Sequence, residues 1–183
     1  MRVISGRLKG KKLFALKGLS LRPTSDRVRE AIFDILQKFP PGERVLDLFA
    51  GTGALGIEAL SRGAKRAVFV EGSASSCAVL LRNIESCQLS SQAEVLAREV
   101  QAGLKALESR KEVFDLVFLD PPYGKGLALQ ALRDLSRGSL LAPDALIVAE
   151  HSPQEDLAFI PDLERIDRRK YGGTEVSIFR LKE

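Results

Sequence analysis

From residue 44 onward, short apolar segments alternate with segments of helical periodicity, and this alternation restricts the fold more than any other feature. The expected strands are residues 44–50, 67–71, 93–97, 114–120 and 145–151, and the expected helices between them are residues 54–63, 74–87, 100–110 and 126–137. Strands that alternate with helices form βαβ units, in which parallel strands are covered by helices. We therefore expect an α/β fold, with a mostly parallel sheet and helices on both faces.

The two ends of the chain add further elements to this arrangement. Near the C-terminus, two runs of alternating residues flank Gly172 and Gly173, which predicts an antiparallel hairpin and brings the sheet to seven strands. Before the first strand, an amphipathic segment follows Thr24 or Ser25, either of which can cap a helix, and ends at residues 40–42.

Length and composition fit one globular domain. The chain has 183 residues, of which 45% are hydrophobic and 28% charged. It has no apolar run of membrane-spanning length, and its start lacks the apolar core of a signal peptide. We therefore expect a cytoplasmic monomer without a membrane partner. Two cysteines and one histidine make neither a disulfide framework nor a metal site, so we expect no metal.

Positive charge is concentrated at the N-terminus. Residues 1–30 hold nine Lys or Arg against two Asp or Glu, so this segment is +7 while the rest of the chain sums to −3. Such a segment is typical of proteins that bind a polyanionic partner such as nucleic acid, although a charged surface that is simply solvated would explain the sequence equally well. We divide the chain into a basic arm, residues 1–24, and a domain, residues 25–183. The candidate RNA-binding residues are Arg2, Arg7, Lys9, Lys11, Lys12, Arg22 and Arg27.

A glycine-rich loop follows the first expected strand. Gly51, Gly53 and Gly56 form the pattern G-x-G-x-x-G between a strand and a helix, and Glu71 ends the next strand. The glycines allow a tight turn and a close approach of the backbone to a ligand, and the acid can bind both hydroxyls of a ribose. The combination predicts a site for an adenosine-containing cofactor.

Asp47 helps to distinguish between possible cofactors. Its carboxylate comes four residues before Gly51, where it disfavours a pyrophosphate and favours a ligand with cationic groups. S-adenosylmethionine carries a sulfonium and an ammonium group and no phosphate. ATP fits less well because no G-K-[ST] follows the glycines. Asp47 can also serve only to cap the loop, so NAD remains an alternative at this point.

The segment "FLDPPYG" ends the expected strand 114–120 at the edge of the sheet where ligands bind. The Asp120 carboxylate and the Pro121 carbonyl could hold both N–H groups of an exocyclic amine and turn its lone pair toward a methyl donor. Paired prolines, Pro121 and Pro122, stiffen the backbone that carries this carbonyl. Tyr123 offers a face on which a splayed base can stack. Catalysis would then consist mostly of alignment.

Several motifs resemble a known family. "DLFAGTGALG" with "DPPY" resembles the Rossmann-like S-adenosylmethionine-dependent methyltransferases that act on exocyclic amines. "RVISGRLKGKKL", "LRPTSDRVRE", "DLFAGTGALGIEALSRGA" and "YGGTEV" together resemble the bacterial 16S rRNA (guanine(966)-N(2))-methyltransferase family over essentially the whole chain. The resemblance implies a Rossmann-like fold, S-adenosyl-L-methionine as cofactor, and methyl transfer to N2 of a guanine in 16S ribosomal RNA or the assembling small subunit.

The resemblance also implies roles for individual residues. It places the methionine end of the cofactor at Asp47, Ala50, Gly51, Thr52 and Gly53, the ribose on Glu71, and the target amine at Asp120, Pro121, Pro122 and Tyr123. Near the adenine, the broader family has Asp or Asn followed by Ala, where this chain has Glu99 and Val100, so we assign Glu99 there.

Alternative functions remain open on the sequence alone. Related enzymes that methylate adenine N6 usually have Asn in place of Asp120, which favours guanine without excluding adenine or another rRNA guanine. An NAD-dependent oxidoreductase would explain only the glycine loop and Glu71. A non-catalytic RNA-binding module would explain only the basic arm.

Overall fold

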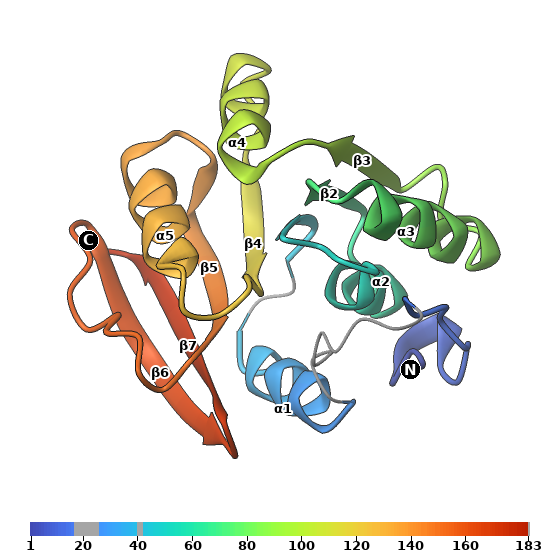
Figure 1. Ribbon diagram of the computed structural model, residues 1–183, viewed down its shortest axis with the longest axis horizontal. Helices are drawn as coiled ribbons and strands as arrows, with labels where there is room; N and C mark the ends of the chain where they lie inside the picture. Colours follow the sequence, from blue (N-terminus) through green and yellow to red (C-terminus); the bar gives the residue numbers. More distant parts are fainter. Residues whose placement is uncertain (17–25, 40–41, 183) are drawn as a thin grey trace.

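A seven-stranded sheet organises the molecule, which we describe from a computed structural model covering residues 1–16, 26–39 and 42–182 (Figure 1). Its strands are β1 (Arg44–Leu48), β2 (Arg66–Glu71), β3 (Ala93–Ala97), β4 (Phe114–Leu119), β5 (Leu141–His151), β6 (Leu163–Tyr171) and β7 (Thr174–Leu181). They lie in the order β3-β2-β1-β4-β5-β7-β6. Strands β1 to β5 are parallel, β7 is antiparallel to β5, and β6 is antiparallel to β7. The expected parallel sheet with an antiparallel hairpin is confirmed.

Helices cover both faces of the sheet. They are α1 (Asp26–Leu36), α2 (Ala54–Ser61), α3 (Ala74–Ser86), α4 (Val100–Ser109) and α5 (Leu127–Arg137), with a short 3-10 helix at Gly6–Leu8. The buried side chains of α1, α2 and α3 share one hydrophobic cluster, and those of α4 and α5 share another. Neighbouring strand residues such as Val45 and Leu46 belong to different clusters, because successive side chains point to opposite faces of a sheet.

Burial on both faces explains why the strand predictions were close. A parallel strand covered on two sides is apolar throughout, so its sequence stands out as a continuous run. The expected start of the fifth strand was wrong, because β5 begins at Leu141 rather than at residue 145. Leu141 pairs with Phe114 ahead of a register irregularity, so the turn-like Pro143 and Asp144 lie within the strand.

The helix expected before the first strand corresponds to α1. It begins at Asp26 and ends at Leu36. The two candidate capping residues, Thr24 and Ser25, lie outside the described residues, as does the proline pair at 40–41.

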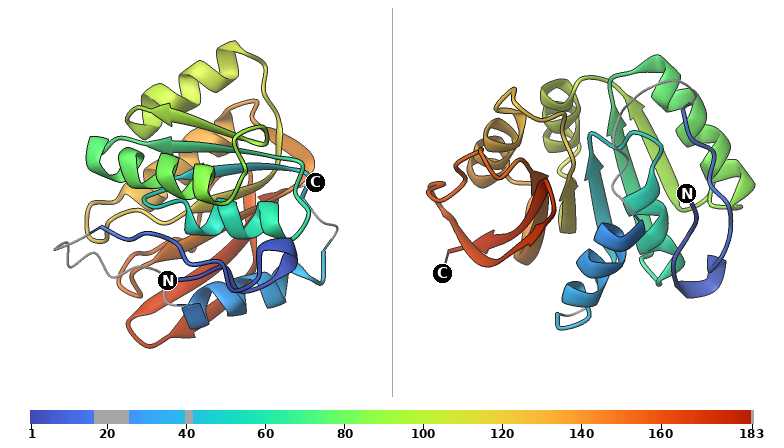
Figure 2. Two further views of the ribbon diagram at one scale, coloured as in Figure 1. Left: turned by 90° about the vertical axis from the view of Figure 1, so that its right-hand side faces the viewer. Right: turned by 60° about the horizontal axis from the view of Figure 1, so that its bottom comes forward.

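The N-terminal segment packs on the domain as far as residue 16, where it runs beside α2 and α3 in both views of Figure 2. A bridge pairs Arg2 with Lys12 in antiparallel fashion, and the amide of Val3 donates to the carbonyl of Lys11 at 2.9 Å. Val3 and Leu13 are buried in the same cluster as α1, α2 and α3. The basic segment is therefore fastened by apolar side chains, although its charged groups face outward.

Two side chains of α2 hold this segment in place. The buried carboxylate of Glu58 accepts hydrogen bonds from the amides of Ile4 and Ser5 at 2.7 and 2.9 Å. The Ser61 hydroxyl donates to the Ser5 carbonyl at 2.6 Å and accepts from the Leu8 amide at 3.0 Å. Since α2 follows the glycine loop directly, the N-terminal segment is tied to the element that carries the candidate cofactor site.

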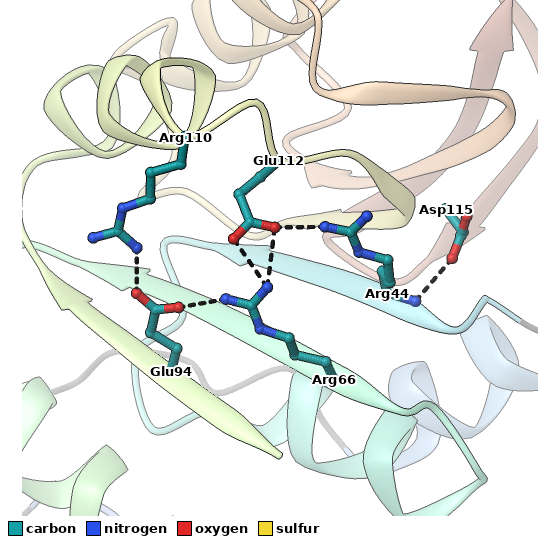
Figure 3. A network of polar contacts seen from close by, with 6 residues as sticks. All are labelled: Arg44, Arg66, Glu94, Arg110, Glu112 and Asp115. Atoms are coloured by element: carbon teal, nitrogen blue, oxygen red, sulfur yellow. Dashed lines mark hydrogen bonds and ion pairs between the residues drawn. The ribbon is translucent and has the colours of Figure 1, made fainter. Parts of the chain in front are cut away.

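A series of ion pairs lies at the end of the sheet where the parallel strands begin (Figure 3). Glu112 lies between Arg44 and Arg66, which begin β1 and β2, at 2.5 and 2.9 Å. Arg66 continues to Glu94 on β3 at 2.5 Å, and Glu94 to Arg110. The pKa of the Glu94 carboxyl is lowered, chiefly by the hydrogen bond from Arg110, which favours the ionised form. These ion pairs hold together the starts of the strands, and the other ends of β1 and β2 contribute to the site described below.

The two cysteines and the single histidine are buried in the fold. Cys77 and Cys87 are free thiols, and both are buried. The buried His151 donates from Nδ1 to the carbonyl of Ser152 at 2.9 Å, and its Nε2 hydrogen-bonds the hydroxyl of Ser177 at 2.9 Å. Within the described ranges, no three His, Cys, Asp or Glu side chains are grouped so as to hold a metal ion. No helix in those ranges is long and apolar enough to cross a membrane.

Candidate active site

The glycine loop joins β1 to α2 in a conformation that requires its glycines. Gly51 and Gly53 have φ of 56° and 81°, in the left-handed region that L side chains rarely adopt. A Cβ on Gly56 would lie 2.3 Å from the ring of Phe69, so α2 can pack this closely on the sheet only with glycine there. This matches the roles expected of the glycines in such a loop.

Glu71 links the end of β2 to this loop. Its Oε2 accepts a hydrogen bond from the Gly51 amide at 2.7 Å, and its Oε1 accepts from the Ser73 amide at 2.7 Å. The Ala50 amide also donates to the Val70 carbonyl at 3.1 Å. A carboxylate offers about four acceptor positions, so Glu71 can hold the loop and still accept from two ribose hydroxyls.

Asp47 is a buried carboxylate beneath the same loop. Its side chain belongs to β1, is 1% exposed, and accepts a hydrogen bond from the Gly56 amide at 2.9 Å. Burial raises the pKa of Asp47 well above its usual value, and the negative charges of Asp120 and Glu71 raise it further. The ends of β2 and β4 therefore bring the carboxyl groups of Glu71 and Asp120 within electrostatic reach of Asp47 on β1, which favours a cationic ligand and disfavours a pyrophosphate.

The segment Asp120 to Tyr123 continues from β4 at the same edge. β4 ends at Leu119, Pro121 is buried, and Pro122 is exposed. Asp120 is half-buried, and its charge acts on Asp47 and Tyr123. The structure thus places the expected catalytic carboxylate next to the expected cofactor residues.

Tyr123 is held by two residues that sequence reasoning missed. Its hydroxyl donates to Oε1 of Glu150 at 2.9 Å and also hydrogen-bonds the hydroxyl of Thr174. Burial raises the pKa of Tyr123, and the carboxylate of Glu150 raises it further. Thr174 lies in the motif "YGGTEV", which carried part of the family resemblance, whereas Glu150 had no local signal beyond its place near a strand end.

Glu99 lies at the N-terminus of α4 with no hydrogen bond from its side chain to the helix end. It is exposed and leans against Gly72, where a Cβ would lie 2.5 Å from Oε1 of Glu99. This places Glu99 beside the residue that follows Glu71, at the ends of β2 and β3.

The candidate RNA-binding side chains lie on the outside of the N-terminal segment and on α1. The exposed residues among them are Arg2, Arg7, Lys9, Lys11, Lys12 and Arg27, while Arg22 lies outside the described residues. Arg7 donates to the side chain of Gln92. For the other candidates, the support for a contact to RNA is that they are positively charged and exposed.

One buried amide connects the N-terminal segment with the glycine loop. Asn83 of α3 is 0% exposed, and its Oδ1 accepts from the Phe14 amide at 2.7 Å. Its Nδ2 donates to the carbonyls of Phe14 and Thr52 at 3.1 and 2.9 Å. The N-terminal segment and the loop expected to bind the cofactor therefore share a side chain, which nothing in the local sequence indicated.

Comparisons with known proteins fit this arrangement. The sequence model of the family described as "Conserved hypothetical protein 95" matches residues 1–180. The chain belongs to this family.

Relatives in this comparison extend over the whole chain or most of it. "Putative rRNA methyltransferase YlbH" of Bacillus subtilis is 39% identical over 183 residues, which cover 100% of both chains. "Ribosomal RNA small subunit methyltransferase D" of Haemophilus influenzae is 40% identical over 158 residues, or 86% of this chain and 81% of the relative. The protein of that name from Escherichia coli is 34% identical over 94% of this chain and 85% of the relative.

Solved structures agree with the fold. "Putative methyltransferase yhhF from Escherichia coli" has a TM-score of 0.86 at 31% identity, covering 100% of this chain and 98% of that chain. A structure from Haemophilus influenzae, titled a "putative methylase", has a TM-score of 0.80 at 33% identity, with 100% and 98% covered. The Rossmann-like methyltransferase fold that the motifs implied is confirmed.

Proposed function

We propose that the chain transfers a methyl group from S-adenosyl-L-methionine to the exocyclic N2 amine of a guanine in 16S ribosomal RNA. The observation that carries this proposal is the position of Asp120: it directly follows Leu119 of β4, which pairs with Leu48 of β1, the strand that carries Asp47 and leads into the glycine loop. A group that can hold an amine thus lies at the same strand ends as the groups that suit a cationic adenosine ligand.

The residues present fit this cofactor. Glu71 keeps acceptor positions for ribose hydroxyls while it holds Gly51. Burial favours the protonated form of Asp47, and the positive charge of a bound ammonium or sulfonium group would favour its ionised form, so binding and ionisation would support each other. When bound, the cofactor supplies an electrophilic methyl group on its sulfonium. An NAD-dependent oxidoreductase is disfavoured, because its pyrophosphate would lie near these carboxylates.

Asp120 and Pro121 align the amine in this mechanism. The Asp120 carboxylate and the Pro121 carbonyl each accept one N–H of the guanine amine, which directs the nitrogen lone pair toward the methyl group. Tyr123 is 38% exposed, and its ring provides the surface on which the base stacks. Asp120 also accepts the proton that the amine releases.

Small-subunit ribosomal RNA is the substrate that the relatives and the charge distribution support together. Relatives at 34% and 40% identity carry the name "Ribosomal RNA small subunit methyltransferase D". The exposed lysines and arginines at the N-terminus provide groups for phosphate contacts. On this proposal the protein acts as a monomer in the cytoplasm, on the RNA or on the assembling small subunit.

A methyl-transfer assay tests the proposal directly. Cofactor with a labelled methyl group is incubated with the protein and either naked 16S RNA or small subunits from a strain that lacks this protein. The RNA is then digested to nucleosides and analysed by mass spectrometry. We expect N2-methylguanosine at a single position. Label in N6-methyladenosine, or tight binding of NAD in place of S-adenosylhomocysteine, would overturn the proposal.

A further inference from the structure

Tyr123 lies in a turn that does little to fix its ring. The three residues that follow it, Gly124, Lys125 and Gly126, are exposed, and so is Pro122 before it. Tyr123 itself is 38% exposed. The side chain is therefore held mainly at its far end, where the hydroxyl belongs to a cluster of hydrogen-bonded polar side chains.

That group consists of three oxygen-bearing side chains. The Tyr123 hydroxyl donates to Oε1 of Glu150 at 2.9 Å and contacts the Thr174 hydroxyl, which also lies 3.2 Å from the same carboxylate oxygen. Because the Tyr123 hydroxyl donates its proton to Glu150, the single proton of the Thr174 hydroxyl is shared between the Tyr123 oxygen and the carboxylate as alternative acceptors. Thr174 is also within 3.3 Å of the His151 carbonyl, which gives its proton a further acceptor.

The two partners come from the antiparallel part of the sheet. Glu150 lies near the end of β5, and Thr174 begins β7. The register pairs His151 with Glu175, which sets Thr174 just beyond the end of β5. The neighbouring Glu175 receives two hydrogen bonds from Arg168 of β6, at 2.7 and 2.9 Å. The turn of the hairpin is thus braced where it reaches Tyr123.

Burial makes this contact more than incidental. Glu150 is 5% exposed and Thr174 is 8% exposed. Burying a carboxylate and a hydroxyl costs free energy unless hydrogen bonds replace their water contacts, and an apolar pair would avoid that cost. The hydrogen bond from this buried pair to the Tyr123 hydroxyl gives the pair a direct role in holding the ring of the catalytic segment.

We propose that Glu150 and Thr174 are positioning residues, which hold the Tyr123 ring by its hydroxyl so that the C-terminal hairpin fixes the surface on which the target base stacks. This inference rests on the proposed function, in which a base stacks on Tyr123. It assigns the Tyr123 hydroxyl to attachment rather than to proton transfer, and it gives β6 and β7 a part in substrate positioning.

Kinetics of single and double variants test the proposal. Tyr123→Phe keeps the ring and removes the hydroxyl, and Thr174→Val removes one partner. Glu150→Gln replaces the charged acceptor by a neutral amide whose oxygen accepts a weaker hydrogen bond, and Thr174→Ser is the matched control that keeps a hydroxyl. We expect each of the first three to lower kcat/KM for RNA by about 3- to 10-fold, the effect of one lost or weakened hydrogen bond, with Glu150→Gln at the lower end and the S-adenosylhomocysteine Kd unchanged. Thr174→Ser should retain most activity.

A double-variant cycle separates positioning from a purely structural role. If Thr174 acts through the Tyr123 hydroxyl, Thr174→Val should cost nothing further once Tyr123→Phe is present. Independent, multiplicative losses in the double variant would overturn the proposal. So would wild-type kcat/KM in both Thr174→Val and Glu150→Gln.

Ring motion can be measured without any RNA. The chain has two tyrosines and no tryptophan, so Tyr171→Phe leaves Tyr123 as the emitting residue. In this background we expect Thr174→Val and Glu150→Gln to increase the fast component of the fluorescence anisotropy decay, and Thr174→Ser to leave it unchanged. Equal decay in all variants would contradict the attachment. If the parent protein makes no N2-methylguanosine, the proposed function fails, and anisotropy still decides whether the ring is held as we infer.

Discussion

Glu71 accepts a hydrogen bond from the backbone amide of Gly51 at 2.7 Å, so the end of β2 holds the loop that leaves β1. The same carboxylate is the proposed acceptor for the ribose hydroxyls. Loop geometry and cofactor affinity should therefore change together when Glu71 is altered, which the sequence pattern alone did not indicate.

The first prediction concerns Glu71. Glu71→Ala removes the ribose acceptors and the partner of Gly51, and charge-assisted hydrogen bonds contribute roughly 1.5–3 kcal/mol. We expect the S-adenosylhomocysteine Kd, measured by calorimetry, to rise about 10- to 100-fold. Glu71→Gln retains one acceptor oxygen and should lose less. The exposed Glu85 of α3 gives a control, Glu85→Ala. An unchanged Kd in Glu71→Ala would remove Glu71 from the site.

The second prediction concerns Asp120. If its carboxylate aligns the amine, Asp120→Ala should reduce turnover sharply and leave the S-adenosylhomocysteine Kd nearly unchanged. Asp120→Asn keeps an acceptor oxygen and should retain part of the activity. The two quantities are measured by single-turnover methyl transfer and by calorimetry. If cofactor binding is lost in parallel with turnover, Asp120 belongs to the cofactor site instead.

The third prediction concerns Asp47, whose pKa is raised by burial and by the charges of Asp120 and Glu71. In the unfolded chain this carboxyl releases its proton near pH 4, whereas the folded protein retains it to higher pH. The folded state then binds more protons than the unfolded state, so the contribution of Asp47 to stability falls as the pH rises from about 4 to the raised pKa. Between these two pKa values, each unit of pH lowers the free energy of unfolding by up to about 1.4 kcal/mol.

Asp47→Asn removes this titration and keeps an oxygen that can accept from Gly56. We expect the ligand-free variant to melt at a higher temperature than the wild type above pH 4, with a weaker dependence on pH, and to bind S-adenosylhomocysteine more weakly because the charge facing its ammonium is lost. Asp144→Asn, at an exposed position of β5, is the control. A lower melting temperature with unchanged affinity would show that Asp47 only caps the loop.

Much of the geometry of the candidate cofactor site was predictable because it depends on one strand, one loop and the start of one helix. Gly51, Gly53 and Gly56 each meet a local requirement, and Glu71 follows from the next strand end. Asp120 follows from the same rule applied to β4. Ligand-binding residues at the carboxyl ends of parallel strands need no knowledge of side-chain packing.

The contacts that were not predicted join segments far apart in the chain. Tyr123 and its partners Glu150 and Thr174 are separated by 27 and 51 residues. Asn83 and Phe14 are 69 residues apart. These contacts depend on the pairing of β5 with β7 and on how the N-terminal segment lies against α3. Charge composition predicted a basic segment at the surface, but it did not indicate that Val3 and Leu13 would be buried in the core.

The last prediction concerns the basic N-terminal segment. Lys9, Lys11 and Lys12 are exposed, so their charges are available for phosphates. Neutralising each phosphate releases counterions, and the RNA affinity should fall with salt at a log–log slope of about −0.7 to −0.9 per contact. Replacing all three lysines by alanine should flatten that slope by roughly two to three units if each contacts a phosphate.

Two controls make this measurement decisive. The double variant Lys105→Ala, Lys111→Ala removes exposed positive charge at and just after α4 and should keep the wild-type slope. The S-adenosylhomocysteine Kd of the triple variant should also be unchanged, because the links from the N-terminal segment to the glycine loop involve Met1 and the buried Asn83, whereas the three lysine side chains are exposed. A wild-type salt slope in the triple variant would show that the lysines are only a solvated surface, and RNA contacts would then have to be sought elsewhere on the protein.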